Sequence, residues 1–483
     1  MSISSALSSA VSGLAASSRA AEVVSSNLAN VLTPGYGPRQ LELETLGYGV
    51  PGVGITGITR VVDQGIIADR QAAGSELAYA DTRARFLSDI ARVIGTPDDP
   101  ASLSGRLAAF EASLVSASAN PDDPSSLQNA VLRAGELVGS LNTASSQVER
   151  QRTAADGQIA RAVEDTNTLL GQIREINIRI ANHGTSDHRA ATLLDQRQGL
   201  VDQLSEFVPV RQVPRDNGTV ALFTPGGAIL LDGNAATLDF APSNVVAPHM
   251  TLGNGLLSGL TINGVNVPPS GSNSPIGGGK LSALFSIRDD LAVDMQTQFD
   301  AVSRDMIERF QQAGLDPTRA PGDPGLFTDA GAAFDPLNEV GIAGRINVNT
   351  AVDPDQGGAF WRLRDGLGAT VQGPAGNGTL LSQLTSALSA GQSLASGDLG
   401  GVARPAAGHF ATLTSRLAQD RLTLDQSLSF ATARQSELAE IELQNGVDSD
   451  AELQRLLVIE QAYSANARMI QTIDDMMQTL LRI

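Results

Sequence analysis

The two ends of the chain share one spacing of apolar positions. From residue 3 to 31, and again from 456 to 480, apolar side chains recur in alternating steps of three and four residues. This is the heptad spacing of coiled-coil helices, in which two positions per repeat form a buried seam. Each seam has one polar position, Ser17 in the first and Asn466 in the second. The pattern therefore predicts a coiled-coil-like helix at each end.

The N-terminal helix is not expected to be stable by itself. Its seam contains six large aliphatic side chains, worth roughly 1.5–3 kcal/mol each when fully buried. Ordering about thirty residues costs roughly 1–2 kcal/mol per residue before helix hydrogen bonds contribute. We therefore expect this segment to be mostly disordered alone, and helical once the C-terminal helix or neighbouring subunits complete the seam. The positions predicted to form this assembly interface are Ile3, Leu7, Leu14, Val24, Leu28, Asn30, Val31, Leu456, Ile459, Tyr463, Asn466, Ile470, Ile473, Met477 and Leu480.

Between the ends, the pattern changes from helix to strand and back. Two near-copies of a Pro-Asp-Asp-Pro turn, at 96–100 and 120–124, each precede a helical start and are typical of turns and helix N-caps. Turns rich in Asn-Gly, Asp-Gly and Gly-Gly in 208–279 predict short antiparallel strands. The predicted elements up to residue 207 are an extended or hairpin segment at 41–62 and helices at 66–94, 125–182 and 186–207. The last two helices are expected to form an antiparallel hairpin around 183–185. The elements that follow are β structure at 208–279, a helix at 281–312, an irregular region at 315–378 with one strand at 346–352, and a helix at 408–444.

These elements predict a mainly α fold with inserted antiparallel β structure (α+β), built as a long-helix bundle with terminal coiled-coil helices. The predicted domains are a terminal coiled-coil domain from 1–35 and 449–483, a long-helix bundle from 36–207 and 379–448, a β domain at 208–279, a helix returning to the bundle at 280–314, and an irregular or β outer insertion at 315–378.

Composition narrows the function classes. The net charge of −19 makes binding to nucleic acid or to an anionic membrane surface unfavourable. The absence of cysteine excludes disulfides, thiolate zinc sites, iron–sulfur clusters and cysteine nucleophiles. The sequence shows neither an apolar run long enough for a membrane span nor a secretory signal, since residues 1–10 contain no Lys or Arg. We expect a chain that is cytoplasmic or that leaves the cell without a cleaved signal.

Several short motifs resemble catalytic or cofactor sites without their context. The segments 47–52 and 52–57 fit GxGxxG, but β-type residues follow instead of the helix that a dinucleotide site needs. The run Gly277-Gly278-Gly279-Lys280 lacks the first glycine and the Ser/Thr of a phosphate loop, which favours a flexible entry into the next helix. His183 and His188 are five residues apart, one too many for a helical zinc pair. No catalytic residue, metal site or cofactor is predicted.

Two segments carry a specific resemblance. Ser25-Ser26-Asn27-Leu28-Ala29-Asn30-Val31-Leu32-Thr33-Pro34-Gly35-Tyr36 closely resembles the N-terminal signature of the bacterial flagellar axial proteins, a family of rod, hook and hook-associated proteins. Glu460-Gln461-Ala462-Tyr463-Ser464-Ala465-Asn466-Ala467-Arg468 resembles its C-terminal counterpart. The interior, with Leu194-Asp195-Gln196-Arg197 and the turn at 216–220, resembles the hook-associated members more than the hook protein.

The resemblance implies a structural protein of the hook–filament junction. Such a protein would be exported unfolded through the flagellar type III channel and assembled outside the cell. It would self-associate into a ring through paired terminal helices, contact the hook protein and hook-associated protein 3, and be held by an export chaperone before assembly. Heptad seams at disordered chain ends suit this role, because they fold only on polymerisation.

A second hypothesis stays open at this point. Some axial proteins carry inserted domains, so the β segment at 208–279 and the region at 315–378 could form a hydrolase or a ligand-binding module. A pocket with converging polar side chains would favour this alternative over a purely structural subunit.

Overall fold

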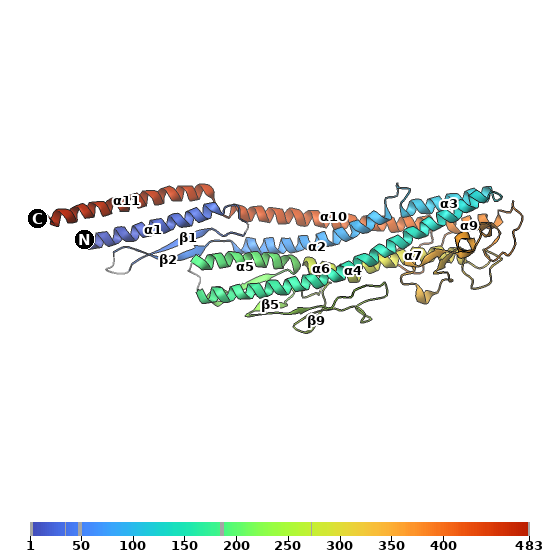
Figure 1. Ribbon diagram of the computed structural model, residues 1–483, viewed down its shortest axis with the longest axis horizontal. Coiled ribbons are helices and arrows are strands. Elements are labelled where there is room, and N and C mark those ends of the chain that lie inside the picture. Colours follow the sequence, from blue (N-terminus) through green and yellow to red (C-terminus); the bar gives the residue numbers. More distant parts are fainter. Residues whose placement is uncertain (1–2, 34, 47–50, 184–187, 272, 482–483) are drawn as a thin grey trace.

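The computed structural model is an elongated molecule whose two chain ends lie together at one tip (Figure 1). It describes residues 3–33, 35–46, 51–183, 188–271 and 273–481. Long helices run along the molecule, and the β excursions and irregular segments lie against the helices or at the far tip (Figure 1). None of the helices among these residues is long and apolar enough to span a bilayer.

The tip that holds both chain ends is formed by two helices and a hairpin, which we call the terminal unit. Helix α1 (Ile3–Ala29) packs on α11 (Ser449–Leu481) and on the antiparallel hairpin of β1 (Arg39–Thr45) and β2 (Val53–Arg60). Helix α1 therefore lies between α11 and the hairpin (Figure 1). The expectation of helices at both ends and of a hairpin at 41–62 agrees with these elements.

The helical bundle begins directly after the hairpin. Its main helices are α2 (Gln64–Ile94), α3 (Leu103–Ala119), α4 (Pro124–His183), α5 (His188–Phe207) and α10 (Ala406–Gln444). Side chains that accept backbone N–H bonds start three of them: Asp63 for α2, Ser102 for α3 and Asp123 for α4. The repeated Pro-Asp-Asp-Pro turns thus precede α3 and α4, as expected. Helices α4 and α5 pack together, while residues 184–187, where the predicted turn falls, lie outside the described residues.

Helix α4 is the central helix of the bundle. Leu137, Val148, Ile159 and Leu170 are fully buried and follow one another at intervals of 11 residues. An 11-residue interval corresponds to 3.67 residues per turn, so these positions stay on one face of a nearly straight helix. Helix α4 consequently contacts α2, α3 and α5, and also the later helices α6 (Gly279–Ser286) and α7 (Ala292–Gln311), along its length.

The β structure predicted at 208–279 consists of two small antiparallel sheets. One contains β3 (Arg211–Pro214), β4 (Val220–Phe223), β5 (Ile229–Asp232) and β6 (Asn234–Ala235), and the other contains β7 (Leu238–Asp239), β8 (Leu260–Ile262) and β9 (Val265–Val267). Asn167 on α4 bonds both the N–H and the C=O of Leu238, at 2.9 and 2.8 Å. Asparagine side chains of the helix therefore hold the sheets against it.

The helix expected at 281–312 is interrupted. Helix α6 (Gly279–Ser286) and helix α7 (Ala292–Gln311) are joined by a π-helical turn at Ile287–Leu291. The turn carries Arg288, whose buried guanidinium lies 2.7 Å from Asp156 and also donates to Asp289 and to the carbonyl of Ser258. A π turn adds a residue to the helix and redirects its side chains. The spacing of apolar residues predicted one unbroken helix here, because hydrophobic period alone does not reveal a π turn.

The region at 315–378 is irregular, as expected, but its strand is shorter than predicted. Strand β11 (Ile346–Val348) pairs with β10 (Phe327–Asp329) and ends before residue 349. Asn349 accepts the N–H of Ala351 and starts a 3-10 turn at Thr350–Val352, which ends the strand. Two short helices, α8 (Arg362–Asp365) and α9 (Thr379–Ser389), complete the far tip.

Candidate assembly interface

The two terminal helices run antiparallel. Gly13 of α1 lies against Asn466 of α11, so closely that a β-carbon on Gly13 would sit 2.7 Å from the Asn466 amide nitrogen. Fourteen residues later in α1, Asn27 donates to Glu452, which lies fourteen residues earlier in α11, at 3.2 Å. Asn466, the polar position of the predicted C-terminal seam, therefore lies opposite Gly13, the only glycine of α1. Because glycine has no side chain, the two helices can approach closely there.

Asn27 is the best-connected side chain of the terminal unit. It is fully buried, and its Oδ1 accepts from the Tyr36 hydroxyl and from the N–H of Arg39, both at 2.9 Å. Its Nδ2 donates to the carbonyl of Arg39 at 2.9 Å and to Glu452. This single amide thus joins α1, the start of the hairpin and α11. A buried amide with every bond made favours one arrangement of these three elements.

The predicted interface residues differ widely in burial. Val24 and Ile473 are buried between the helices, whereas Leu7, Tyr463, Met477 and Leu480 are exposed. The others are partly buried: Ile3, Leu14, Leu28, Asn30, Val31, Leu456, Ile459, Asn466 and Ile470. The face of α11 that carries the predicted interface residues is therefore only partly covered by α1 in a single chain.

Sequence reasoning missed two kinds of residue. Asn27 and Glu452 hold the unit together, but neither belongs to the apolar seam. The signal for Asn27 was its place in the motif Ser25–Tyr36, where a polar side chain falls on a helix with few charges. The second kind is the set of exposed apolar residues on the other faces of α11, namely Leu453, Leu457, Val458, Met469, Met476 and Leu481.

A polar joint connects the terminal unit to the bundle. Asp195 of α5 accepts from Arg60 of β2 at 2.6 Å, from Arg39 of β1 at 3.2 Å and from the N–H of Gly37 at 3.1 Å. One carboxylate thus holds both strands and the turn before them. Asp195 belongs to the Leu194-Asp195-Gln196-Arg197 segment singled out in the sequence, for which this contact gives a structural reason.

The joint continues into the bundle through Gln198 and Glu442. Gln198 accepts from Arg60 and donates to Glu442 of α10 at 3.2 Å. Glu442 in turn pairs with Arg70 of α2, which also lies 2.8 Å from Asp202. Burial, together with the neighbouring Arg60 charge, lowers the pKa of Arg197 to about 10. The joint is therefore a chain of charge-assisted bonds rather than an apolar hinge.

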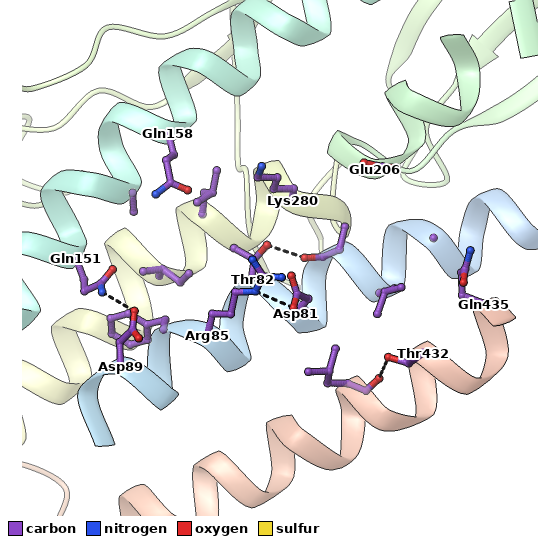
Figure 2. A pocket seen from close by; sticks show the side chains of 18 residues that line it. Asp81, Thr82, Arg85, Asp89, Gln151, Gln158, Glu206, Lys280, Thr432 and Gln435 are labelled. Atoms are coloured by element: carbon purple, nitrogen blue, oxygen red, sulfur yellow. Dashed lines mark hydrogen bonds and ion pairs between the residues drawn. The ribbon is translucent and has the colours of Figure 1, made fainter. Parts of the chain in front are cut away.

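A groove of about 820 Å³ lies between α2, α4, α6 and α10 (Figure 2). Two of its carboxylates have local partners: Asp81 binds Arg85 at 2.9 Å, and Asp89 accepts from Gln151 at 3.0 Å. Neither serine nor histidine is among its lining residues. The lining mixes polar and apolar surface, and the hydroxyls of Thr82 and Thr432 both donate to backbone carbonyls of their own helices.

The remaining motifs have structural explanations. Gly279 begins α6 with φ of 69°, and a β-carbon there would meet the carbonyl of Phe207 at 2.5 Å. The positive φ and the close packing therefore require glycine at position 279, and the expected flexibility of the entry stays a prediction. Strand β2 follows the glycines of the first GxGxxG match, whose residues 47–50 lie outside the described residues.

The histidines give no metal site among the described residues. The side chains of His183 and His188 fall outside the described part. His409 is buried, with Nε2 2.7 Å from the carbonyl of Gln392. In the part of the chain that the structure describes, no group of His, Asp and Glu side chains is placed to hold a metal ion.

Three protein families match parts of the chain, and all are flagellar. The flagellar hook-associated protein FlgK helical domain matches residues 87–326, the flagella basal body rod protein family matches 7–36, and the flagellar basal body rod FlgEFG protein C-terminal family matches 444–483. The two rod matches therefore fall on α1 and α11, and the FlgK match falls on the bundle and the β excursion.

Individual relatives carry the same name. Flagellar hook-associated protein 1 of Bacillus subtilis (strain 168) is 23% identical over 519 residues, which cover 98% of this chain and 97% of that protein. The Salmonella typhimurium protein of that name is 29% identical over 286 residues, or 53% of this chain and 51% of that protein. The match thus spans about half the length of the Salmonella relative.

A solved structure of the flagellar hook junction protein FlgK from Burkholderia pseudomallei is 24% identical, with a TM-score of 0.44, over 54% of this chain and 46% of that one. The family matches follow one another along the chain, and the Bacillus alignment runs almost from end to end. The chain belongs to the family of flagellar hook-associated protein 1.

Proposed function

We propose that this chain is a structural subunit of the bacterial flagellum that joins the hook to the filament and polymerises through its terminal helices. The observation that carries the proposal is the exposed apolar surface of α11. Along this helix, Glu452 and Ile473 are the buried residues among those described, whereas Leu457, Val458 and Leu480 are exposed. Exposed apolar surface of this extent is typical of an interaction site.

The partners of this surface are further copies of the chain, arranged as a ring, with the hook protein and hook-associated protein 3 on either side. Before assembly, an export chaperone covers the C-terminal helix. Type III export of an unfolded chain accounts for the location outside the cell, at the hook–filament junction. The acidic net charge of −19 speaks against nucleic acid and anionic membranes as partners.

A non-enzymatic role is supported by how the interior uses its charged groups. Arg152 is buried and donates to the carbonyls of Arg288, Ala247 and Met250. Arg309, also buried, binds Asp305 at 2.7 Å and donates to the carbonyls of Ala387 in the last turn of α9, Ala390 and Arg404. These groups fasten the β and irregular excursions to the helices, which disfavours the alternative of an enzymatic or ligand-binding insertion.

Deletion of residues 1–32 or 450–483 tests the proposal. We expect each deletion to abolish junction assembly and motility while the bundle still unfolds cooperatively on heating. Circular dichroism of the purified deletion variants and swimming assays of cells that carry them as the sole copy give the two readouts. Filament growth with either deletion would contradict the proposal.

A further inference from the structure

The terminal unit has an apolar groove at one end and an uncovered apolar tip at the other. The groove, of about 500 Å³, lies between the C-terminal half of α1, strand β1 and the start of α11. Val24, Leu41, Val458 and Ile459 contribute its apolar walls. We call it the proximal groove, because it lies beside the joint with the bundle.

The tip is the last turn and a half of α11. The antiparallel register places Gly13 beside Asn466 and Asn27 beside Glu452, so residues after about 476 extend past Ile3, the first described residue of α1. Met476, Met477, Leu480 and Leu481 are all about half exposed or more. We call these four residues the distal tip.

From these two features we infer that the distal tip of one copy docks into the proximal groove of the next copy. The inference rests on the proposed function and names the partner surface. A tip cannot fill its own groove, since the helix from Ile459 to Met476, roughly 26 Å at 1.5 Å per residue, separates the two. The occupant must come from another molecule. Because tip and groove are different surfaces, the contact is heterologous, and such contacts propagate into rings or tubes.

Charge complementarity supports this pairing. Arg455 lines the groove with a side chain that is 58% accessible, and among the described residues its guanidinium donates to Glu452 at 2.8 Å on one side only. Asp474 and Asp475 are exposed immediately before the tip. A docked tip therefore brings two carboxylates to the rim that carries this arginine, where opposite charges favour the correct orientation.

Disulfide mapping tests the contact, because the natural chain contains no cysteine. A full-length chain carrying both Val458→Cys and Leu480→Cys should give, in flagella oxidised after isolation, a ladder of covalent dimers, trimers and larger species. The matched control combines Leu480→Cys with Glu460→Cys, an exposed position outside the groove lining. We expect at least a several-fold lower yield from the control pair. A dimer band alone, or equal yields from both pairs, would overturn the inference.

Charge exchange provides a second test that does not depend on oxidation. Arg455→Asp should reduce motility several-fold, and adding Asp475→Arg to the same chain should restore it, because each contact again joins opposite charges. If the double variant Arg455→Asp/Asp475→Arg does not regain motility, the proposed docking mode is wrong. Such a failure is distinguishable from failure of the proposed function, since deletion of 450–483 would still abolish the junction.

Discussion

Helices α4 and α11 are both long, yet they use their apolar side chains differently. On α4, the residues at 11-residue intervals are fully buried by five neighbouring helices of the same chain. On α11, most apolar residues are partly or wholly exposed, because α1 is its principal neighbour. The bundle is therefore stabilised by contacts within the same chain. In the terminal unit, by contrast, much of the apolar surface of α11 stays exposed in a single chain. Three predictions compare these two regions, in order of expected effect, and a fourth concerns the pH dependence of the bundle.

The largest effect is expected in the bundle, from Asp156→Ala. It removes a fully buried carboxylate from Arg288, leaving a buried guanidinium with less compensation, which costs about 3 kcal/mol. The midpoint of thermal unfolding should fall clearly. The matched control is Asp232→Ala, which breaks an exposed pair with Arg215 and should leave the midpoint unchanged. Equal midpoints for both variants would show that the buried pair does not stabilise the bundle.

A smaller and local effect is expected in the terminal unit, from Asn27→Ala. The N–H and C=O of Arg39 and the carboxylate of Glu452 would lose their partner, at a cost of about 1–3 kcal/mol. Hydrogen exchange should accelerate in α1 and β1 and stay slow in α4. Asn30→Ala, which removes a bond to a partly exposed carbonyl, is the control and should change exchange less. Faster exchange spread through α4 would contradict the separation of the two regions.

Two glycine substitutions should have opposite signs. Gly13→Ala forces a methyl group against Asn466 and should loosen α1 from α11. Gly139→Ala lies on α4 with open space around it and should stabilise that helix by about 0.5–1 kcal/mol. Hydrogen exchange rates at residues 3–29 measure the effect of Gly13→Ala, and unfolding monitored by circular dichroism measures that of Gly139→Ala. Adding Asn466→Ala should relieve the Gly13→Ala defect, and absence of this rescue would argue against the close contact.

The remaining prediction concerns the pH dependence of the bundle's stability. Burial raises the pKa of Asp300 to about 6, although the N–H groups of Ala343 and Gly341 favour its charged form. The folded state therefore binds a proton that the unfolded state releases near pH 4. The stability contributed by this group is present below about pH 4 and is lost as pH rises through about 6. Denaturant unfolding at pH 4.5, 5.5 and 6.5 should show this decline in the natural chain and not in Asp300→Asn. Parallel pH profiles would assign the decline to other groups.

Local patterns predicted the helices, the Pro-Asp-Asp-Pro turns and the place of the β excursion, because period, caps and turn residues act within a few positions. The missed features involve residues far apart in sequence. The π turn at 287–291 accompanies the bond between Arg288 and Asp156, 132 residues apart. The short strand β11 ends where Asn349 can cap a turn and also donate to Gly325. No local pattern records such partners.

For the candidate interface, the sequence determined which side chains are apolar and on which helical faces they lie, because heptad spacing fixes direction on a helix. Tertiary structure decided which of them stay uncovered. The antiparallel register set by Gly13 with Asn466 and by Asn27 with Glu452 leaves the end of α11 beyond α1. Burial depends on what lies opposite a residue, and that is a property of the packed molecule rather than of its neighbours in sequence.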